Sequence, residues 1–303
     1  MQTSNDFKNS LKFQSISNGE TIAYRSQIRV ASKANFILVH GWISSSLVMW
    51  NEIVSLLSDL SLSFYAVDLR GFGDSSYNKS IKSIEDFAED IHLFAKALGL
   101  NDLIVAGYSM GGAVALQFAA NYPENLRKLI LFDSVGSRGV LSYYEKDGQQ
   151  VQIVKTEDLG KSGFWDVADM KFRNDIAGAS GFLQLGTFNA GKQPTAEVLR
   201  KYVVGFEKER NVTDCLYWLT HWNITNESNG VVDGNGKINN IKCKCLILHG
   251  DQDRLIDVKE SELTAQALGK LAKLEIVADS GHCPVMSQPE KTAALIKVFF
   301  ADI

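Results

Sequence analysis

The stretch LIVAGYSMGGAVALQ, residues 103–117, joins a short apolar run typical of a buried strand to a pattern typical of a helix. Ser109 lies at the junction, within Gly107-Tyr108-Ser109-Met110-Gly111, which fits the pattern GxSxG. In this pattern a tight strand-to-helix turn pushes the serine outward, and the glycines, which lack a side chain, allow neighbouring backbone segments to pack closely. The helix that begins beneath the serine favours negative charge there through its unpaired NH groups and its dipole. The stretch therefore predicts a serine nucleophile suited to acyl transfer.

Strand and helix patterns alternate on both sides of this stretch. Asn18-Gly19 between two alternating apolar and polar runs predicts an opening β-hairpin over residues 12–28. Single helical patterns, one of them at residues 46–60, separate the later strand-like runs, which predicts right-handed crossovers and a parallel sheet. These strand-like runs lie at residues 35–39, 64–67, 103–108, 129–132, 245–249 and 274–277. We therefore predict an α/β protein with a mostly parallel, eight-stranded sheet flanked by helices.

The alternation stops between residues 137 and 240. This segment contains many aromatic residues, a helical pattern over residues 195–222 and a polar, glycine-rich stretch at residues 226–240. It is far longer than an ordinary connecting loop. We therefore predict a mostly helical cap at residues 137–240, inserted between two parts of one core, residues 1–136 and 241–303.

Acidic side chains and a histidine follow the later strands. Asp251 and Asp253 come directly after the run at 245–249, and His282 comes after the run at 274–277. The carboxyl ends of parallel strands meet at one edge of an open α/β sheet, where ligands bind. Ser109, an acid and His282 can therefore converge there, in the chain order serine, acid, histidine.

This order resembles that of the α/β-hydrolase family, and the resemblance covers most of the chain. The segments that carry it are His40-Gly41-Trp42, residues 68–75, the serine turn, residues 250–253 and residues 281–284. Relatives that are dehalogenases or epoxide hydrolases carry an aspartate at the position of Ser109, so those activities are disfavoured. The resemblance also implies that His40 braces its loop and transfers no proton.

The resemblance implies a role for each site residue. Ser109 would attack an acyl carbon, His282 would take its proton and later activate water, and Asp253 would stabilise the imidazolium. The backbone NH groups of Trp42 and Met110 would form the oxyanion hole.

The choice of the acid also comes from the family pattern. An acid followed by a short apolar pair, here Leu255-Ile256, favours Asp253, with Asp251 as the second candidate. Asp133 is the third candidate, because some relatives place the acid after the preceding strand.

The cap is expected to roof the site and to supply apolar surface for the substrate. Trp218 and Trp222 lie four residues apart on one predicted helical face, so they can point together into the cleft. We therefore predict an apolar or aromatic acyl substrate that these two tryptophans contact.

Composition excludes several classes of partner. The chain has 303 residues and a formal net charge of −4, without a basic run for nucleic acid or anionic lipid. It contains neither a run of 18 apolar residues nor an apolar secretion signal, which favours a cytoplasmic protein without a membrane span. Cys215, Cys243, Cys245 and Cys283 are expected to be reduced and buried. His92, His221 and His249 are isolated, so neither a metal nor a cofactor is predicted.

The sequence therefore predicts a serine hydrolase that cleaves a carboxylic ester or a lactone through an acyl-enzyme. Hydrolysis of carbon–carbon bonds, amides or thioesters, and perhydrolysis, use the same triad and stay open. A ligand-binding or sensor protein on the same fold is the alternative of another class.

Overall fold

A computed structural model describes residues 7–153, 156–161 and 163–301. Within these ranges eight strands form one sheet in the order β1-β2-β4-β3-β5-β6-β9-β10. β2 pairs antiparallel with β1 and β4, and all the other neighbours pair in parallel, which confirms the predicted sheet. The strands of this sheet are β1 (Lys12–Ser15), β2 (Thr21–Gln27), β3 (Ala34–Val39), β4 (Leu62–Val67), β5 (Leu103–Tyr108), β6 (Leu126–Phe132), β9 (Lys244–Gly250) and β10 (Ala272–Val277).

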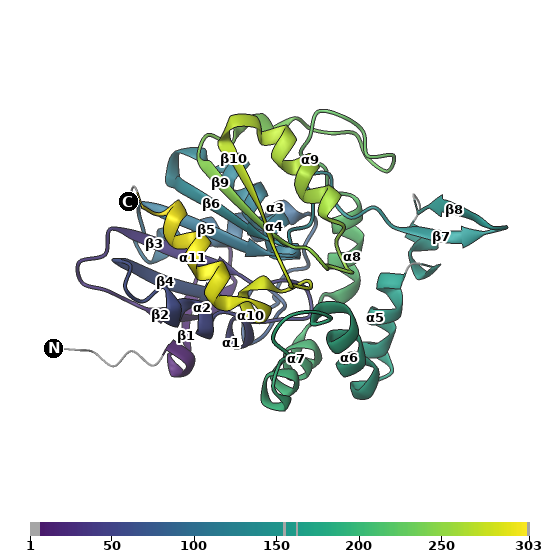
Figure 1. Ribbon diagram of the computed structural model, residues 1–303, viewed down its shortest axis with the longest axis horizontal. Helices are drawn as coiled ribbons and strands as arrows, with labels where there is room; N and C mark the ends of the chain where they lie inside the picture. The colour runs from purple at the N-terminus through teal and green to yellow at the C-terminus, as the bar shows by residue number, and fades with distance from the viewer. Residues whose placement is uncertain (1–6, 154–155, 162, 302–303) are drawn as a thin grey trace.

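Helices cover both faces of the sheet (Figure 1). One face packs against α3 (Ile84–Ala97), α4 (Met110–Asn121) and α9 (Val258–Leu268). The other face packs against α1 (Ser46–Met49), α2 (Asn51–Leu56), α10 (Pro284–Ser287) and α11 (Pro289–Phe299). The single helix predicted over residues 46–60 is therefore two short helices. The opening hairpin is confirmed, because β1 pairs with β2.

The segment between β6 and β9 leaves this framework. It contains α5 (Gly163–Phe172), α6 (Ile176–Phe182), the π-helix η4 (Leu183–Thr187), α7 (Ala196–Lys208) and α8 (Val212–Thr220). It also contains a hairpin that the sequence analysis did not predict, β7 (Tyr143–Lys146) with β8 (Gln149–Gln152), which projects from the body in Figure 1.

The continuous helical pattern at residues 195–222 breaks between α7 and α8. At the break the backbone NH of Arg210 donates to the carbonyl of Gly71 (2.8 Å), and the Asn211 side chain donates to the carbonyl of Arg70 (2.9 Å). These bonds to the loop after β4 replace the helical bonds of α7. They bring the end of α7 down onto the core.

The polar stretch after α8 also returns to the core. Its 3-10 helix η5 (Lys237–Asn240) contacts α4, and Ile224, Ile238 and Ile241 are buried in the core cluster beside α4. The predicted boundary at residue 240 therefore falls after a stretch that already packs on the core.

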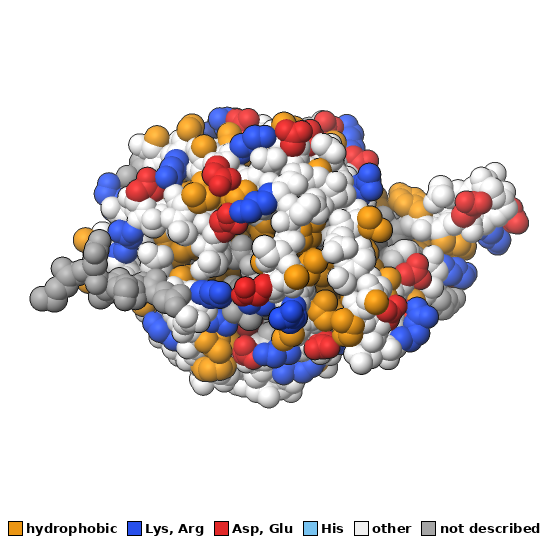
Figure 2. All heavy atoms as spheres, turned by 60° about the horizontal axis from the view of Figure 1, so that its bottom comes forward, with side chains coloured by type: hydrophobic (Ala, Val, Ile, Leu, Met, Phe, Trp, Pro, Cys, Tyr) orange, Lys and Arg blue, Asp and Glu red, His pale blue; other side chains and the backbone are white. Residues whose placement is uncertain are grey.

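The distribution of charged side chains on the surface (Figure 2) is consistent with the small net charge. Figure 2 shows basic and acidic side chains interspersed with small apolar patches on the face that contains the lower part of Figure 1. No helix in the described ranges is long and apolar enough to cross a membrane.

Candidate active site

Ser109 occupies a strained turn between β5 and α4. Its backbone has φ 53° and ψ −118°, a region that residues with a side chain rarely adopt. The backbone NH of Ser109 donates to the carbonyl of Phe132 (2.9 Å), and that of Val135 donates to the carbonyl of Ser109 (3.1 Å). The end of β6 and the loop after it therefore fix the turn at which the sequence predicts a nucleophile.

The two glycines of the turn are required by close packing. A Cβ on Gly107 would overlap the carbonyl of Gly111, and a Cβ on Gly111 would overlap the carbonyls of Val39 and His40. The start of α4 therefore packs directly against the end of β3, from which the loop with Trp42 departs.

His40 holds the loop that carries Trp42. Its Nε2 accepts a hydrogen bond from the backbone NH of Leu69 (3.0 Å), so its Nδ1 carries the proton and donates to the carbonyl of Gly41 (2.7 Å). Burial lowers the pKa of His40, although Asp68 and the bond to Gly41 oppose this shift. A neutral His40 that bridges two loops fits the bracing role implied by the resemblance.

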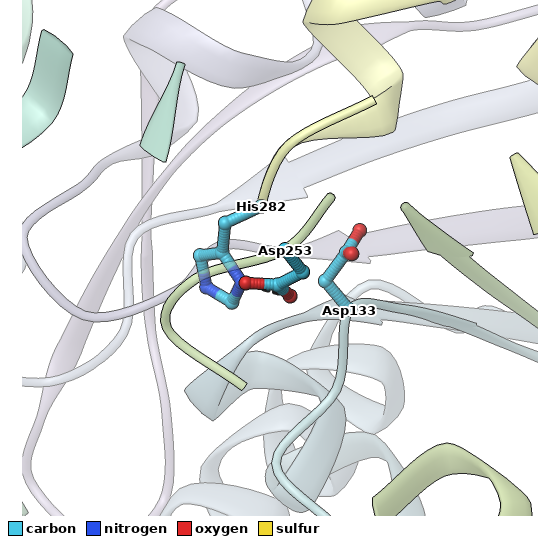
Figure 3. A group of neighbouring side chains, drawn as sticks. All are labelled: Asp133, Asp253 and His282. Carbon is cyan, nitrogen blue, oxygen red and sulfur yellow. Dashed lines mark hydrogen bonds and ion pairs between the residues drawn. The ribbon is translucent and has the colours of Figure 1, made fainter. Parts of the chain in front are cut away.

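Asp253 and His282 form the polar centre of the site. The Nδ1 of His282 lies 2.7 Å from Oδ2 of Asp253, and Oδ1 of Asp253 accepts the backbone NH groups of Leu255 (2.8 Å) and Ile256 (3.1 Å). Figure 3 shows the Asp253 carboxyl directed at the imidazole ring, with Asp133 behind it. The carboxylate is thus aimed so that Nε2 of His282 can serve as a base.

Asp133 lies on the far side of Asp253. It is fully buried, has φ 39°, and accepts the backbone NH of Gly250 (2.9 Å). Burial and the neighbouring charge of Asp253 raise the pKa of Asp133 well above its usual range. Burial alone would also raise the pKa of Asp253, but His282 and His249 together lower it. Asp253 is therefore the ionised acid, and Asp133 is neutral.

Asp133, Asp253 and His282 bring possible metal-binding atoms within 4.8 Å of one another. The geometry fits a hydrogen-bonded group better than a metal site, because His282 and Asp253 already bond to each other and an oxygen of Asp133 already accepts from Gly250. Asp251, the second candidate acid, is exposed and accepts the backbone NH of Ser280 (3.1 Å). It therefore does not face the imidazole.

Ser109 and His282 line one small cavity of about 40 Å³. The cavity also contacts Trp42 on the loop after β3, and Met110 begins α4, where the first NH groups have no helical acceptor. The further lining residues are Ile43, Tyr108, Phe182, Leu183, Thr187, Tyr202, Leu255 and Ile256.

The residues between β6 and β9 that line this cavity are not the predicted ones. The Trp222 indole NH donates to the Gln117 side chain (2.7 Å), and that of Trp218 donates to the carbonyl of Ile81 (3.1 Å). Both tryptophans pack against the core cluster beside α4, and neither lines the cavity of Ser109. The prediction that they contact substrate is therefore replaced by a packing role. It assumed that both tryptophans lie on one helix, but α8 ends at Thr220, so Trp222 lies beyond it.

Sequence reasoning missed Phe182, Leu183, Thr187 and Tyr202. The first three lie at α6 and the π-helix η4, which no periodicity in the sequence indicates. Such π-helical turns are frequent at functional sites. Leu255 and Ile256 had a sequence signal, because they are the apolar pair that follows the acid.

Glu209 is a buried carboxyl behind the Trp42 loop. It follows α7 and is 1% exposed. Burial raises the pKa of Glu209 to about 8, although Lys171, the Trp42 side chain and the backbone NH of Ile43 favour its charged form. The end of α7 thus places a neutral carboxyl against the loop that carries Trp42.

The stability of the protein should fall as the pH rises from 4.5 to about 8, because only the unfolded chain ionises Glu209 in that range. Between pH 4.5 and about 8 the unfolded chain loses the Glu209 proton while the folded chain keeps it. The free energy of unfolding therefore falls across that window, on the order of 3 to 5 kcal/mol for a shift of this size. Urea unfolding at pH 5 and pH 8 should show that Glu209→Gln removes this loss, whereas Glu207→Gln on the exposed side of α7 keeps it. An equal loss in Glu209→Gln would contradict the assignment.

Comparison with known proteins identifies the family. The profile described as alpha/beta hydrolase fold matches residues 34–289, so the chain belongs to the α/β-hydrolase fold family. Human monoacylglycerol lipase ABHD6 is 28% identical over 278 residues, which cover 91% of this chain and 77% of the human protein.

Solved structures agree on the fold. An esterase from Exiguobacterium antarcticum superposes with a TM-score of 0.72 at 18% identity, covering 95% of this chain and 98% of the esterase. The enol-lactonase from Burkholderia xenovorans LB400 superposes with a TM-score of 0.73 at 17% identity, covering 96% of this chain and all of the lactonase (100%).

Proposed function

We propose that this α/β hydrolase is a serine hydrolase that cleaves carboxylic esters or lactones through an acyl-enzyme. The observation that carries the proposal is the cavity that Ser109 and His282 share, together with the 2.7 Å distance from Oδ2 of Asp253 to Nδ1 of His282. The similarity to a monoacylglycerol lipase supports ester hydrolysis.

The reaction follows from these positions. Nε2 of His282 takes the Ser109 hydroxyl proton as Oγ bonds to the acyl carbon, and the carbonyl oxygen becomes an oxyanion facing the NH groups of Trp42 and Met110. His282 then gives the proton to the leaving alkoxide, which departs as an alcohol. Water repeats the sequence on the acyl-enzyme, so that a carboxylic acid leaves and Ser109 regains its proton. Asp253 stabilises the imidazolium in both halves.

The substrate extends beyond the triad cavity. A volume of about 40 Å³ holds little more than the reacting groups, whereas an adjoining groove of about 350 Å³ has the size of a small-molecule site. Phe182 and Leu255 line both spaces, and Leu141 and Tyr143 add apolar groove surface. The groove therefore suits the acyl chain of an apolar ester.

A fluorophosphonate probe tests the proposed reaction. It should label Ser109 rapidly in the folded protein. In unlabelled enzyme, p-nitrophenyl esters should be hydrolysed with an initial burst of one p-nitrophenol per active site, where the number of active sites is the number that the probe can label. Folded protein that neither reacts with the probe nor hydrolyses any ester or lactone would instead favour the ligand-binding alternative.

Widening the passage between cavity and groove should change substrate preference. In Phe182→Ala the passage is wider, so longer acyl esters should gain relative to short ones. One methylene in an apolar pocket is worth about 1 to 3 kcal/mol, so we expect a shift of roughly ten- to two-hundredfold in relative kcat/KM. The measurement is kcat/KM across p-nitrophenyl esters of increasing chain length.

Phe172→Ala is the matched control, because Phe172 is also an aromatic residue of the cap but is 60% exposed and does not line the cavity. It should preserve the ranking of esters. Trp222→Ala should lower the melting temperature and also preserve the ranking. An unchanged ranking in Phe182→Ala would place the acyl chain elsewhere.

A further inference from the structure

A second buried histidine, His249, lies behind the proposed catalytic acid. It is fully buried at the end of β9, with Nε2 3.0 Å from the carbonyl oxygen of Ile256 and 3.2 Å from Oδ2 of Asp253. Its Nδ1 lies 2.7 Å from Oγ of Ser261 on α9. The triad described above does not use this residue, and the sequence analysis interpreted it as an isolated side chain.

The neighbours of His249 determine where its proton lies. The Ile256 carbonyl and the Asp253 carboxylate can only accept hydrogen bonds, so Nε2 carries the proton in the neutral ring. Nδ1 is then an acceptor and receives the hydroxyl hydrogen of Ser261. Ser261 thus accommodates the tautomer whose NH is donated to the Ile256 carbonyl and lies beside Oδ2 of Asp253.

His249 is not needed to hold Asp253 in place. Two backbone NH groups, of Leu255 and Ile256, already fix Oδ1 of Asp253. Oδ2 is the atom that binds His282, and the same oxygen faces His249. His249 therefore acts on the charge of the oxygen that His282 uses.

We propose that His249 is a positioning residue that, with Ser261, limits the negative charge that Asp253 presents to His282. The inference rests on the proposed serine hydrolase reaction. An NH beside Oδ2 disperses its charge, so the carboxylate stabilises the imidazolium form of His282 less strongly. Without that NH the carboxylate binds the imidazolium more strongly, and the base form appears only at higher pH.

Other titratable groups around this pair do not produce the same effect. Asp133 lies 3.8 Å from Nε2 of His249 on the loop after β6, and burial and the charge of Asp253 keep it neutral. Tyr108 from β5 and Cys283 beside His282 are buried, and burial raises the pKa of each, so both stay neutral below pH 8. His282 and Asp253 themselves are the titratable pair on which His249 acts.

Two substitutions of similar shape separate the proposed role from packing. In His249→Gln the side-chain NH₂ reaches the position of Nε2, beside the Ile256 carbonyl and Oδ2 of Asp253, whereas in His249→Asn it reaches only the position of Nδ1. The measurement is the rate of Ser109 labelling by a fluorophosphonate from pH 5 to pH 9, which needs no knowledge of the substrate. We expect the acidic limb of the profile to move up by roughly half a pH unit or more in His249→Asn and to stay at the wild-type position in His249→Gln.

The outcomes are distinct. A limb that stays at the wild-type position in both variants, or moves equally in both, overturns the proposal and leaves His249 as a packing residue. If His249→Asn does not fold, His249→Met takes its place with the same expectation. Wild-type protein that shows no labelling of Ser109 at any pH contradicts the serine hydrolase proposal itself, and it is recognised before the variants are compared.

Discussion

Replacing Ser109 with alanine is expected to abolish covalent turnover and to leave a folded protein. Loss of the nucleophile removes the acyl-enzyme route, so hydrolysis of p-nitrophenyl esters should fall by roughly 10⁴- to 10⁶-fold, and fluorophosphonate labelling should disappear. Purified variant protein, checked by circular dichroism and by its melting temperature, provides the measurement. Substantial esterase activity in Ser109→Ala would move the nucleophile elsewhere.

Two further substitutions make this result specific. Ser134→Ala is the control, because Ser134 lies close to α4 on the loop after β6 but does not line the cavity of Ser109. It should keep the activity. Ser109→Gly should be as inactive as Ser109→Ala but more stable by about 1 kcal/mol, because glycine adopts a φ of 53° without strain. Equal stability would argue against a strained turn.

The features that the sequence predicted best depend on short-range constraints. The GxSxG turn needs glycine at positions where backbone of a neighbouring segment leaves no room for a Cβ. Gly107 and Gly111 are both at such positions. The alternation of strand and helix patterns determined the parallel sheet, since few connections satisfy the crossover rule. Because strand ends share one edge, chain order alone brought Ser109, Asp253 and His282 to the same region.

The features that the sequence did not predict depend on contacts between distant segments. The break between α7 and α8 arises from hydrogen bonds of Arg210 and Asn211 to the loop after β4, which helical periodicity does not register. The end of α8 at Thr220 also leaves Trp222 outside the helix that was expected to carry both Trp218 and Trp222. The proposed role of His249 was equally hidden, because Ser261 contacts the ring only when α9 packs against β9.

Replacing Asp253 with asparagine is expected to have the second largest effect. The amide has no negative charge to stabilise the imidazolium, and its NH₂ group can donate to Nδ1 of His282 and select the tautomer that protonates Nε2. Both changes remove the base, so kcat should fall by roughly 10³- to 10⁴-fold near pH 7. The measurement is kcat for p-nitrophenyl esters, with fluorophosphonate labelling rates as a second readout.

Two neighbouring acids provide the comparison that identifies the functional one. Asp251→Asn should cost far less, because Asp251 is exposed and bonds to the backbone of Ser280. Asp133→Asn should also stay within about tenfold of wild type, because burial and the charge of Asp253 keep Asp133 neutral, and a neutral amide replaces a neutral carboxyl. A larger loss in Asp251→Asn than in Asp253→Asn would reassign the acid to Asp251. A loss in Asp133→Asn that equals that in Asp253→Asn would show that the charge belongs to the pair of carboxyls, since two acids that share one proton titrate together.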